Sequence, residues 1–462
     1  MSVRANAVVV SALAASLGGI VGCEREKKED SLPSVASIVS TEGDTVSIRL
    51  SKSPTVASLS MPATVSSPRG AERLLIPDEI SSAHIADVAA LPDGRVALLL
   101  RDFHEVVIVD NGVIERRFGR KGRGPGEFRD PLAIEANHEA FAVLDIDGVE
   151  IFSLEGTSRG RMRLPWLPDW SVAFNSRPLL YHQAPYQSGP EDPTRRIARH
   201  GMGFAIIAAG RSERVIPPEP GKKQHLQLAL LQLDVQTLRS DSVLLVRGSE
   251  RAMSMSAVTD RSGRPLSNVV QPVSEPLFGA RPLIAGSATW IAVFDPARNV
   301  VGVSSPGDST TVLIAWPSGE VAVSDSIRAI AVDWQNRDLI TAAPSDSLAR
   351  SWSRNTRRQS FEQKLRASQA TPFSDSLAPL AAMFATSRCL WLVGVDPRDF
   401  TDGTGHWGIA VDVKSGSVVG PLRLSTRGTQ LRDIGNGYAY SIGRNQLGEF
   451  YVERAPLPAC AE

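Results

Sequence analysis

An internal repeat in the first half of the chain constrains the fold more than any other feature. Residues 93–112 can be laid over residues 137–156 at a constant offset of 44 positions. Each copy contains a short turn, an apolar strand, a polar break, a second strand of alternating polarity and a turn with glycine. Repeats of about 40 to 50 residues built from such strands are typical of β-propeller blades. One blade alone leaves its apolar faces uncovered, so the repeat predicts a closed ring of blades.

Later parts of the chain carry weaker copies of the same two-strand pattern, at residues 290–316, 389–416 and 437–453. Residues 170–250 are the least regular, and there we expect strands near residues 171–174, 204–209, 226–233 and 243–246. Length alone favours two or three domains, but a repeat array is a large single unit. Counting units gives six, with five or seven as alternatives. We therefore predict an all-β fold, a six-bladed β-propeller of four-stranded antiparallel blades, in one domain over residues 34–462.

Two further segments complete the predicted propeller. Residues 35–40 and 45–50 read as strands, and we expect them to close the ring by pairing with the C-terminal blade. Residues 345–368 are polar and charged, with apolar side chains at roughly helical spacing: Leu348, Trp352, Phe361 and Leu365. This pattern predicts a short amphipathic helix inserted between blades. It would cover either exposed blade edges or a binding site.

The N-terminus has the pattern of a secretory signal. Residues 1–22 contain one cation, Arg4, followed by a small and apolar run that ends at Cys23. The last four residues of this region, Ile-Val-Gly-Cys, resemble the lipobox of bacterial lipoproteins. That resemblance implies that Cys23 is lipidated and becomes the first residue of the mature protein. Cleavage by an ordinary signal peptidase is the alternative.

Residues 23–33 follow as a charged, hydrated segment that suits a flexible tether. Several acyl chains would hold such a protein stably at a membrane. In the sorting pattern of lipoproteins, Glu24 after the cysteine implies the outer membrane. We therefore expect a lipid-anchored protein of the cell envelope, on either the periplasmic or the surface face.

Charge and cysteine content limit the remaining functions. The formal net charge is zero, so the sequence indicates no broad basic surface and no nucleic-acid partner. After Cys23 the chain holds two more cysteines, Cys389 and Cys460. In an oxidising compartment they could form a disulfide that pins the C-terminus, and two unpaired thiols are the alternative.

Residues 119–128 join the two clearest repeats and contain four glycines. Closely spaced glycines let the backbone take positive φ and turn sharply between blades. Phe128 is placed to enter the wedge between two blades, and Glu127 to accept hydrogen bonds from amides in the turn. The glycine spacing matches neither a phosphate-binding loop nor a dinucleotide-binding template.

Two interpretations of this stretch remain open. In one, clustered cations and free amides form an anion-binding site. In the other, the stretch is a solvated basic turn that links two blades. The residues concerned are Arg120, Lys121, Arg123, Gly124, Gly126 and Glu127, with Arg116 and Arg117 beside them.

Residues 118–128, closed by Asp130 and Pro131, resemble the blade-linking motif of bacterial six-bladed β-propeller lipoproteins with NHL-like repeats. Residues 372–377 and 449–457 are also similar to that family. The resemblance extends over residues 35–457 and is weakest at 170–280. It implies the propeller fold, and it implies no activity, because members of the family mostly lack an assigned one.

The sequence contains few patterns that are typical of catalytic sites. Residues 156–160 have the letters of a nucleophile elbow, but that motif needs a strand turning into a helix, and both flanks here read as strands. Residues 145–150 have spaced oxygen ligands without the further acidic positions of a calcium loop, so a hairpin turn explains them better. The seven histidines show no metal-binding spacing. Asp102 and His104 are candidates for a scattered metal site, with a plain surface loop as the alternative.

These observations favour a binding role over a reaction. A rigid ring with loops around its centre suits a ligand or a partner, while the chemistry of those loops varies freely within one fold. We predict a monomeric, envelope-anchored module that binds an unknown protein or small molecule, with no cofactor and no enzymatic activity. The alternative is a metal-dependent hydrolase or lyase with its site on the propeller axis. A purely structural envelope protein is a third class.

Overall fold

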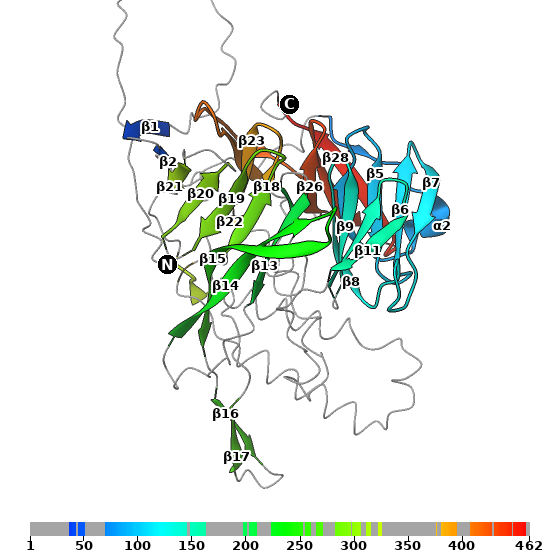
Figure 1. Cartoon of the computed structure of the whole chain (residues 1–462), viewed down its shortest axis with the longest axis horizontal. Coiled ribbons are helices and arrows are strands. Elements are labelled where there is room, and N and C mark those ends of the chain that lie inside the picture. The colour runs from blue at the N-terminus through cyan, green and yellow to red at the C-terminus, as the bar shows by residue number, and fades with distance from the viewer. Residues whose placement is uncertain are drawn as a thin grey trace, which may run out of the picture.

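The computed structural model describes a chain made almost entirely of strands (Figure 1). Within the described residues, helix is limited to α2 (Asp78–Ser81) and the single position Asp325, and no helix there is long and apolar enough to cross a membrane. The described residues are 37–42, 45–50, 70–145, 148–162, 197–200, 203–209, 223–252, 255–259, 265–270, 282–296, 298–305, 311–315, 322–325, 376, 380–394, 407–426, 429–445 and 447–458.

The first two sheets are antiparallel meanders built from the clearest sequence repeats. One contains β4 (Ile85–Ala90), β5 (Val96–Leu100), β6 (Glu105–Asp110) and β7 (Val113–Phe118). The next contains β8 (Pro131–Ala136), β9 (Ala140–Asp145), β10 (Gly148–Ser153) and β11 (Ser158–Met162). Strands β5 and β9 begin 44 residues apart, as the repeat predicts. Both are buried along their whole length because sheets cover them on two sides.

Three more sheets have four strands each. The irregular region forms one of them. The strands predicted near residues 204–209, 226–233 and 243–246 are three of its strands. The strand predicted at 171–174 lies outside the described residues. Its strands are β12 (Ile197–His200), β13 (Gly203–Ala209), β14 (Lys223–Asp234) and β15 (Arg239–Ala252). Another contains β22 (Leu380–Ala385), β23 (Cys389–Gly394), β24 (Trp407–Asp412) and β25 (Val418–Arg423). The last contains β26 (Thr429–Gly435), β27 (Tyr438–Arg444), β28 (Phe450–Pro456) and β3 (Glu72–Arg73).

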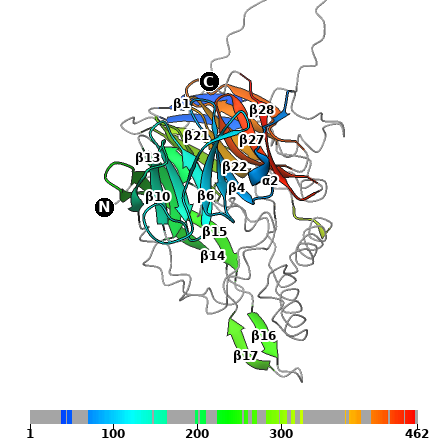
Figure 2. The ribbon, with the colours of Figure 1, turned by 90° about the vertical axis from the view of Figure 1, so that its right-hand side faces the viewer.

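One further sheet has six strands, which corrects the prediction of six four-stranded blades. Its antiparallel part contains β18 (Leu283–Gly286), β19 (Ile291–Asp295), β20 (Val300–Ser304) and β21 (Thr311–Ala315). The hairpin of β1 (Ser37–Glu42) and β2 (Thr45–Leu50) adds to the outer edge, where β2 pairs with β21 in parallel. Five described sheets therefore have four strands. A small pair, β16 (Met255–Thr259) and β17 (Pro265–Val270), lies apart from the ring in Figures 1 and 2.

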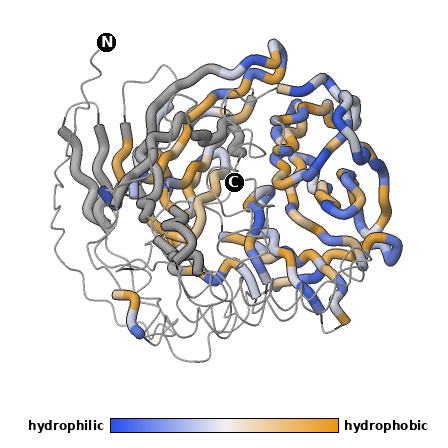
Figure 3. Tube along the Cα trace, turned by 90° about the horizontal axis from the view of Figure 1, so that it is seen from below, coloured by the Kyte–Doolittle hydropathy of each residue, from blue (hydrophilic) through white to orange (hydrophobic). Residues whose placement is uncertain are grey.

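The first strands of the sheets contact one another in a closed order, β4, β8, β12, β18, β22, β26 and back to β4. Five apolar clusters fill spaces between successive sheets. In the view from below, hydrophobic and hydrophilic residues alternate along the coloured parts of the trace (Figure 3). Among the described residues, the clusters lie between five of the six successive pairs of sheets, so these sheets pack face to face as blades do in a ring. The chain is a β-propeller.

The ring closes through a different segment from the predicted one. Strand β3, of two residues, pairs with β28 at the outer edge of the last sheet. In the segment expected in that place, the described strands β1 and β2 form a hairpin that pairs with β21 instead. The hairpin pattern showed that strands were present, but a strand can add to any open edge of suitable register, so the pattern could not choose between edges.

Several predicted segments lie outside the described residues. They are the signal region 1–22, the tether 23–33 and the amphipathic helix at 345–368. The prediction of a single domain over residues 34–462 likewise stays a prediction.

Candidate functional site

The glycine-rich loop connects β7 to β8 and so links the first sheet to the second. Two backbone hydrogen bonds close it. The Phe128 amide donates to the Arg120 carbonyl at 2.7 Å, and the Gly122 amide donates to the Phe128 carbonyl at 2.9 Å. Phe128 is fully buried, and its ring meets that of Phe152 with centroids 5.7 Å apart. It belongs to the apolar cluster shared by both sheets, so its predicted place between blades is confirmed.

Backbone geometry explains the glycines. The loop turns at Gly119 and Gly126, with φ of +93° and +74°. A Cβ atom on Gly119 would overlap the ring of Phe128, and one on Gly122 would overlap the carboxylate of Glu127. Gly119 is therefore required both for its backbone angle and for the space beside the phenylalanine ring.

Glu127 accepts hydrogen bonds from the turn, as the sequence predicted. Its Oε2 atom accepts from the amides of Arg123 at 2.9 Å and Gly124 at 2.8 Å. Its Oε1 atom accepts from Arg120 Nε at 2.8 Å. The Gly124 amide and the Arg120 guanidinium lower the pKa of Glu127 below its ordinary value, since both stabilise the ionised carboxylate.

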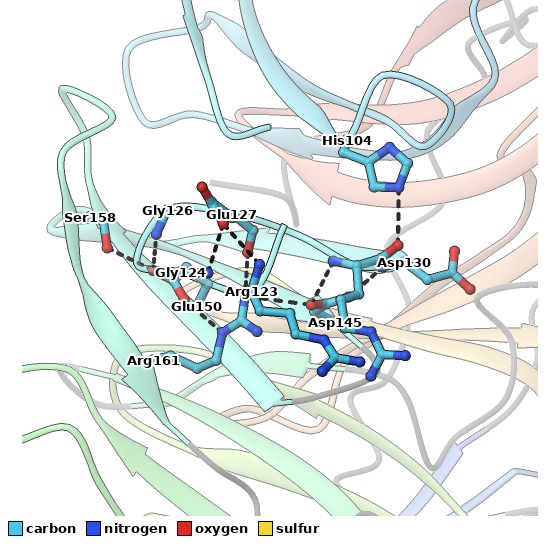
Figure 4. A network of polar contacts seen from close by, with 11 residues as sticks. His104, Arg123, Gly124, Gly126, Glu127, Asp130, Asp145, Glu150, Ser158 and Arg161 are labelled. Carbon is cyan, nitrogen blue, oxygen red and sulfur yellow. Dashed lines mark hydrogen bonds and ion pairs between the residues drawn. The ribbon is translucent and has the colours of Figure 1, made fainter. Parts of the chain in front are cut away.

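A second carboxylate, Glu150 on β10, holds the loop from below (Figure 4). It is fully buried. Its Oε1 atom accepts from the Gly126 amide at 2.6 Å and from Ser158 Oγ at 2.7 Å. Its Oε2 atom accepts from Arg161 Nε at 2.9 Å, and Arg161 also donates to the carbonyl of Glu127. One buried ion pair therefore fixes the loop to the second sheet.

Asp145, at the end of β9, holds the last part of the loop. This fully buried carboxylate accepts from the amides of Arg129 at 3.0 Å and Asp130 at 2.7 Å. The Nη2 atom of Arg161 lies 3.5 Å from Oδ2 of Asp145. Figure 4 shows the two buried carboxylates on either side of this arginine.

The main-chain donors of the loop are therefore used inside the protein. Five amides donate to the carboxylates just described: those of Arg123, Gly124, Gly126, Arg129 and Asp130. An anion bound to these amides would have to displace a carboxylate that is already in place. Of the two interpretations of the loop, this geometry favours the blade link.

The cations of the loop differ in their partners. Arg120 pairs with Glu127, and Arg117 pairs with Glu79 at 2.6 Å. Lys121 and Arg123 are exposed, and neither side chain has an ion pair among the residues that the structure describes. Binding of an anion by these two side chains stays a prediction.

His104 has a structural contact rather than an open coordination site. It lies in the turn between β5 and β6 with φ of +58°. Its Nδ1 atom is 3.3 Å from the carbonyl oxygen of Asp102, and its Nε2 atom is 3.0 Å from that of Arg129. Both ring nitrogens thus face main-chain oxygens. Within the described ranges, no group of three or more histidine, cysteine or acidic side chains is placed to hold a metal ion.

The two remaining sequence patterns also have structural explanations. Ser158 begins strand β11 and donates its hydroxyl to Glu150, with strands on both sides, so no nucleophile elbow forms. Asp145 uses both carboxylate oxygens to accept from main-chain amides. Asp147, a further member of that pattern, lies outside the described residues.

A polar cluster that sequence analysis missed lies where the last sheet meets the first. His84 directly precedes β4, and its ring stacks on Phe450 at the start of β28, with centroids 5.2 Å apart and planes at 18°. The guanidinium of Arg444 lies 5.2 Å from the centroid of the same phenylalanine ring. We call the following group the seam cluster: His84, Arg101, Asp102, Arg432, Arg444 and Phe450.

Charges of both signs act on His84, and three arginines stand against one aspartate in the seam cluster. Burial lowers the pKa of His84 below 6.5, and the charges of Arg101, Arg432 and Arg444 lower it further, against an opposing effect of Asp102. Arg101 is also paired with Asp130, with hydrogen bonds of 2.8 and 3.0 Å. A neutral imidazole beside guanidinium groups can accept or donate a hydrogen bond, and the surrounding cations favour an anionic group. No sequence spacing joins residues so far apart, so no signal could have revealed the cluster.

Two aspartates join the first strands of neighbouring sheets, one at this seam and one at the boundary between the first and second sheets. Asp433 on β26 accepts from the Ala90 amide of β4 at 2.7 Å. Asp87 on β4 accepts from the Ile134 amide of β8 at 3.0 Å. Both carboxylates are buried and lie where the register of their strand shifts. They connect three successive inner strands across sheet boundaries.

The chain has a fold similar to those of several solved structures. One is a putative exported protein from Bacteroides fragilis NCTC 9343, with 11% identity and a TM-score of 0.41, covering 89% of this chain and 98% of that one. Another is the calcium-binding protein regucalcin from Agrobacterium tumefaciens str. C58, with 10% identity, a TM-score of 0.32 and coverage of 84% and 94%. A third is a gluconolactonase from Xanthomonas campestris, with 9% identity, a TM-score of 0.34 and coverage of 86% and 97%.

These likenesses are too distant to carry an argument about function, and the order of the sheets is what establishes the propeller. No family model matches the chain, and no curated protein matches it.

The predicted cysteine sites are only partly within the described residues. Cys389 is fully buried and disulfide-bonded. Cys23, the predicted lipidation site, and Cys460 both lie outside those residues.

Proposed function

We propose that this protein is a cell-envelope lipoprotein whose six-bladed, NHL-like β-propeller binds a ligand or a partner protein. It would be anchored through Cys23, at the outer membrane, and act as a monomeric binder rather than as an enzyme. The observation that carries the binding role is the seam cluster, because it places a half-buried histidine among arginines beside the innermost strands. An anionic group on the ligand or partner fits this environment.

The blade number in this proposal counts β18–β21 as one blade, to which the β1–β2 hairpin adds. The closed order of contacts between the six first strands supports that count. The proposed location in the cell envelope is supported by the signal-like N-terminus and by the disulfide-bonded state of Cys389, since disulfides persist in oxidising compartments outside the cytosol.

The binding role is tested by a pull-down from detergent-solubilised envelope, with the lipidated protein as bait. A second bait carries His84→Gln and Arg444→Gln, and a control bait carries Lys414→Gln on the exposed turn after β24. We expect one partner to be enriched by the wild-type and control baits and lost from the double variant. Equal capture by all three baits would remove the seam cluster from the proposal.

A small-molecule ligand is sought in the same preparations by native mass spectrometry, which would show an added mass on the wild-type protein and not on the double variant. The anchor is tested separately by metabolic labelling with a fatty-acid analogue. Label on the wild-type chain and none on Cys23→Ser is expected. Label on neither would contradict the lipoprotein assignment and leave the binding test unaffected.

A further inference from the structure

Cys389 begins β23 and lies between the last two sheets. Its side chain is fully buried in an apolar cluster formed by strands of both sheets. It is also disulfide-bonded. The sequence contains three cysteines in all, so the partner of Cys389 is either Cys23 or Cys460.

The C-terminal end of β28 meets the apolar cluster that contains this cysteine. Strand β28 stops at Pro456, and Leu457 packs against the cluster that contains Cys389. The amide of Leu457 donates to the carbonyl of Gly437 at 2.7 Å, which holds the chain in this position. Cys460 follows three residues later, and three extended residues span about 10 Å. Bridged cysteines have Cα atoms about 4.4 to 6.8 Å apart, so a bond to Cys389 requires the last residues to stay beside the cluster that Leu457 already contacts.

Cys23 is the poorer candidate. It precedes β1, and that strand lies on the sheet of β18–β21 rather than on either sheet around Cys389. If Cys23 carries lipid, its sulfur is already in a thioether bond and is unavailable for a disulfide.

We propose that Cys389 and Cys460 form a disulfide that fastens the C-terminus to the sheet of β22–β25. In forming it, two thiols lose two protons and two electrons, and one S–S bond is made. The electrons pass by thiol–disulfide exchange to the disulfide of an oxidoreductase in the envelope, which is reduced to two thiols. This disulfide does not depend on the proposed binding role. It is detected on the peptides of Cys389 and Cys460, whereas the lipid anchor is detected on Cys23.

The position of this bond gives it a definite role. The last sheet is completed by β3, which has two residues, so few backbone hydrogen bonds hold its outer edge. Side-chain contacts add to that edge, including an ion pair between Arg454 and Glu72 at 2.6 Å. A covalent bond from the end of β28 to the neighbouring sheet would hold the last sheet from its other side. It therefore stabilises the part of the ring where the chain ends must meet.

The pairing is tested by peptide mapping of the lipidated protein, with free thiols blocked before digestion and without reductant. We expect one cross-linked species that joins the peptides of Cys389 and Cys460. Blocked thiols on both peptides, or a Cys389–Cys23 cross-link, would overturn the proposal.

The role is tested by urea unfolding of the wild-type protein and Cys460→Ser, each with and without reductant. Cys460→Ser leaves the buried Cys389 in place, so it removes the bond without opening a cavity around that residue. Reductant should lower the unfolding midpoint of the wild-type protein to that of the variant and leave the variant unchanged.

The matched control is Ser415→Ala, on the exposed turn after β24, where the hydroxyl contacts the hydroxyl and the amide of Ser417. This variant should unfold as the wild-type protein does and should respond to reductant in the same way. A mapped disulfide with no shift in midpoint on reduction would contradict the stabilising role.

Discussion

Replacing Glu150 by glutamine tests the network that links the first two blades. The side chain keeps its size but loses its charge and one of its two acceptor oxygens. In the structure those oxygens serve the Gly126 amide, the Ser158 hydroxyl and Arg161 Nε, and the carboxylate is fully buried. The substituted amide cannot satisfy all three donors, and it leaves the charge of Arg161 without this partner in a site where that side chain is 14% exposed.

Breaking a buried ion pair by removing one partner costs about 3 to 5 kcal/mol. Because Arg161 also donates to the Glu127 carbonyl and lies near Asp145, we expect the lower end of that range, about 3 kcal/mol. This is a large part of a total folding stability of about 5 to 15 kcal/mol. Urea unfolding followed by tryptophan fluorescence should therefore show a clearly lower midpoint for Glu150→Gln.

Glu115→Gln is the matched control. Glu115 pairs with Arg95 at 2.6 Å, but its side chain is 40% exposed. Exposed pairs contribute about 0 to 1 kcal/mol, so this variant should unfold close to the wild-type midpoint. Equal midpoints for the two variants would refute the claim that the buried network stabilises the blade link. The double variant Glu150→Gln/Arg161→Gln should recover part of the loss, because it also removes the guanidinium that has lost its Glu150 partner.

Three further substitutions test other parts of the structure. Gly119→Ala should lower the free energy of unfolding by more than about 1 kcal/mol, since it adds strain at positive φ and a clash with Phe128. Its control is Gly94→Ala, at a similar φ of +91° but with no atom within 4 Å of the added Cβ. Equal urea midpoints for the two variants would contradict the clash. The lowered pKa of His84 means that the unfolded chain binds this proton more readily, so its contribution to stability is complete above pH 6.5 and declines below it. His84→Gln should flatten the decline just below pH 6.5 in unfolding curves measured against pH, and an unchanged slope would contradict this account of His84. Asp433→Ala should cost about 1 to 3 kcal/mol by leaving a buried amide of β4 without its acceptor; hydrogen exchange at that amide should accelerate, and an unchanged exchange rate would argue against the bond.

The sequence predicted those parts of the fold that depend on local pattern. The 44-residue offset found the first two sheets because their strands follow one another with short turns. The loop residues Phe128 and Glu127 were placed correctly because glycine spacing fixes a turn, and the turn fixes which side chains lie beside it.

Features made by distant segments could not be predicted in the same way. Strand β3 has two residues, too few to show any alternation, yet it completes the last sheet. The stacking of His84 on Phe450 joins residues near opposite ends of the chain. In the sequence, Glu150 is one of the spaced oxygen ligands of an incomplete calcium-binding pattern. Its burial beside Arg161 and its bond to the Gly126 amide show that it anchors the linking loop. Each of these depends on which edges the closed ring brings together.

A crystal structure of the mature protein tests the central claim most directly. We predict a closed ring in which Glu72 and Arg73 pair with β28 and the Asp433 carboxylate accepts the Ala90 amide. A layered sandwich, or a ring left open between β26 and β4, would contradict the account.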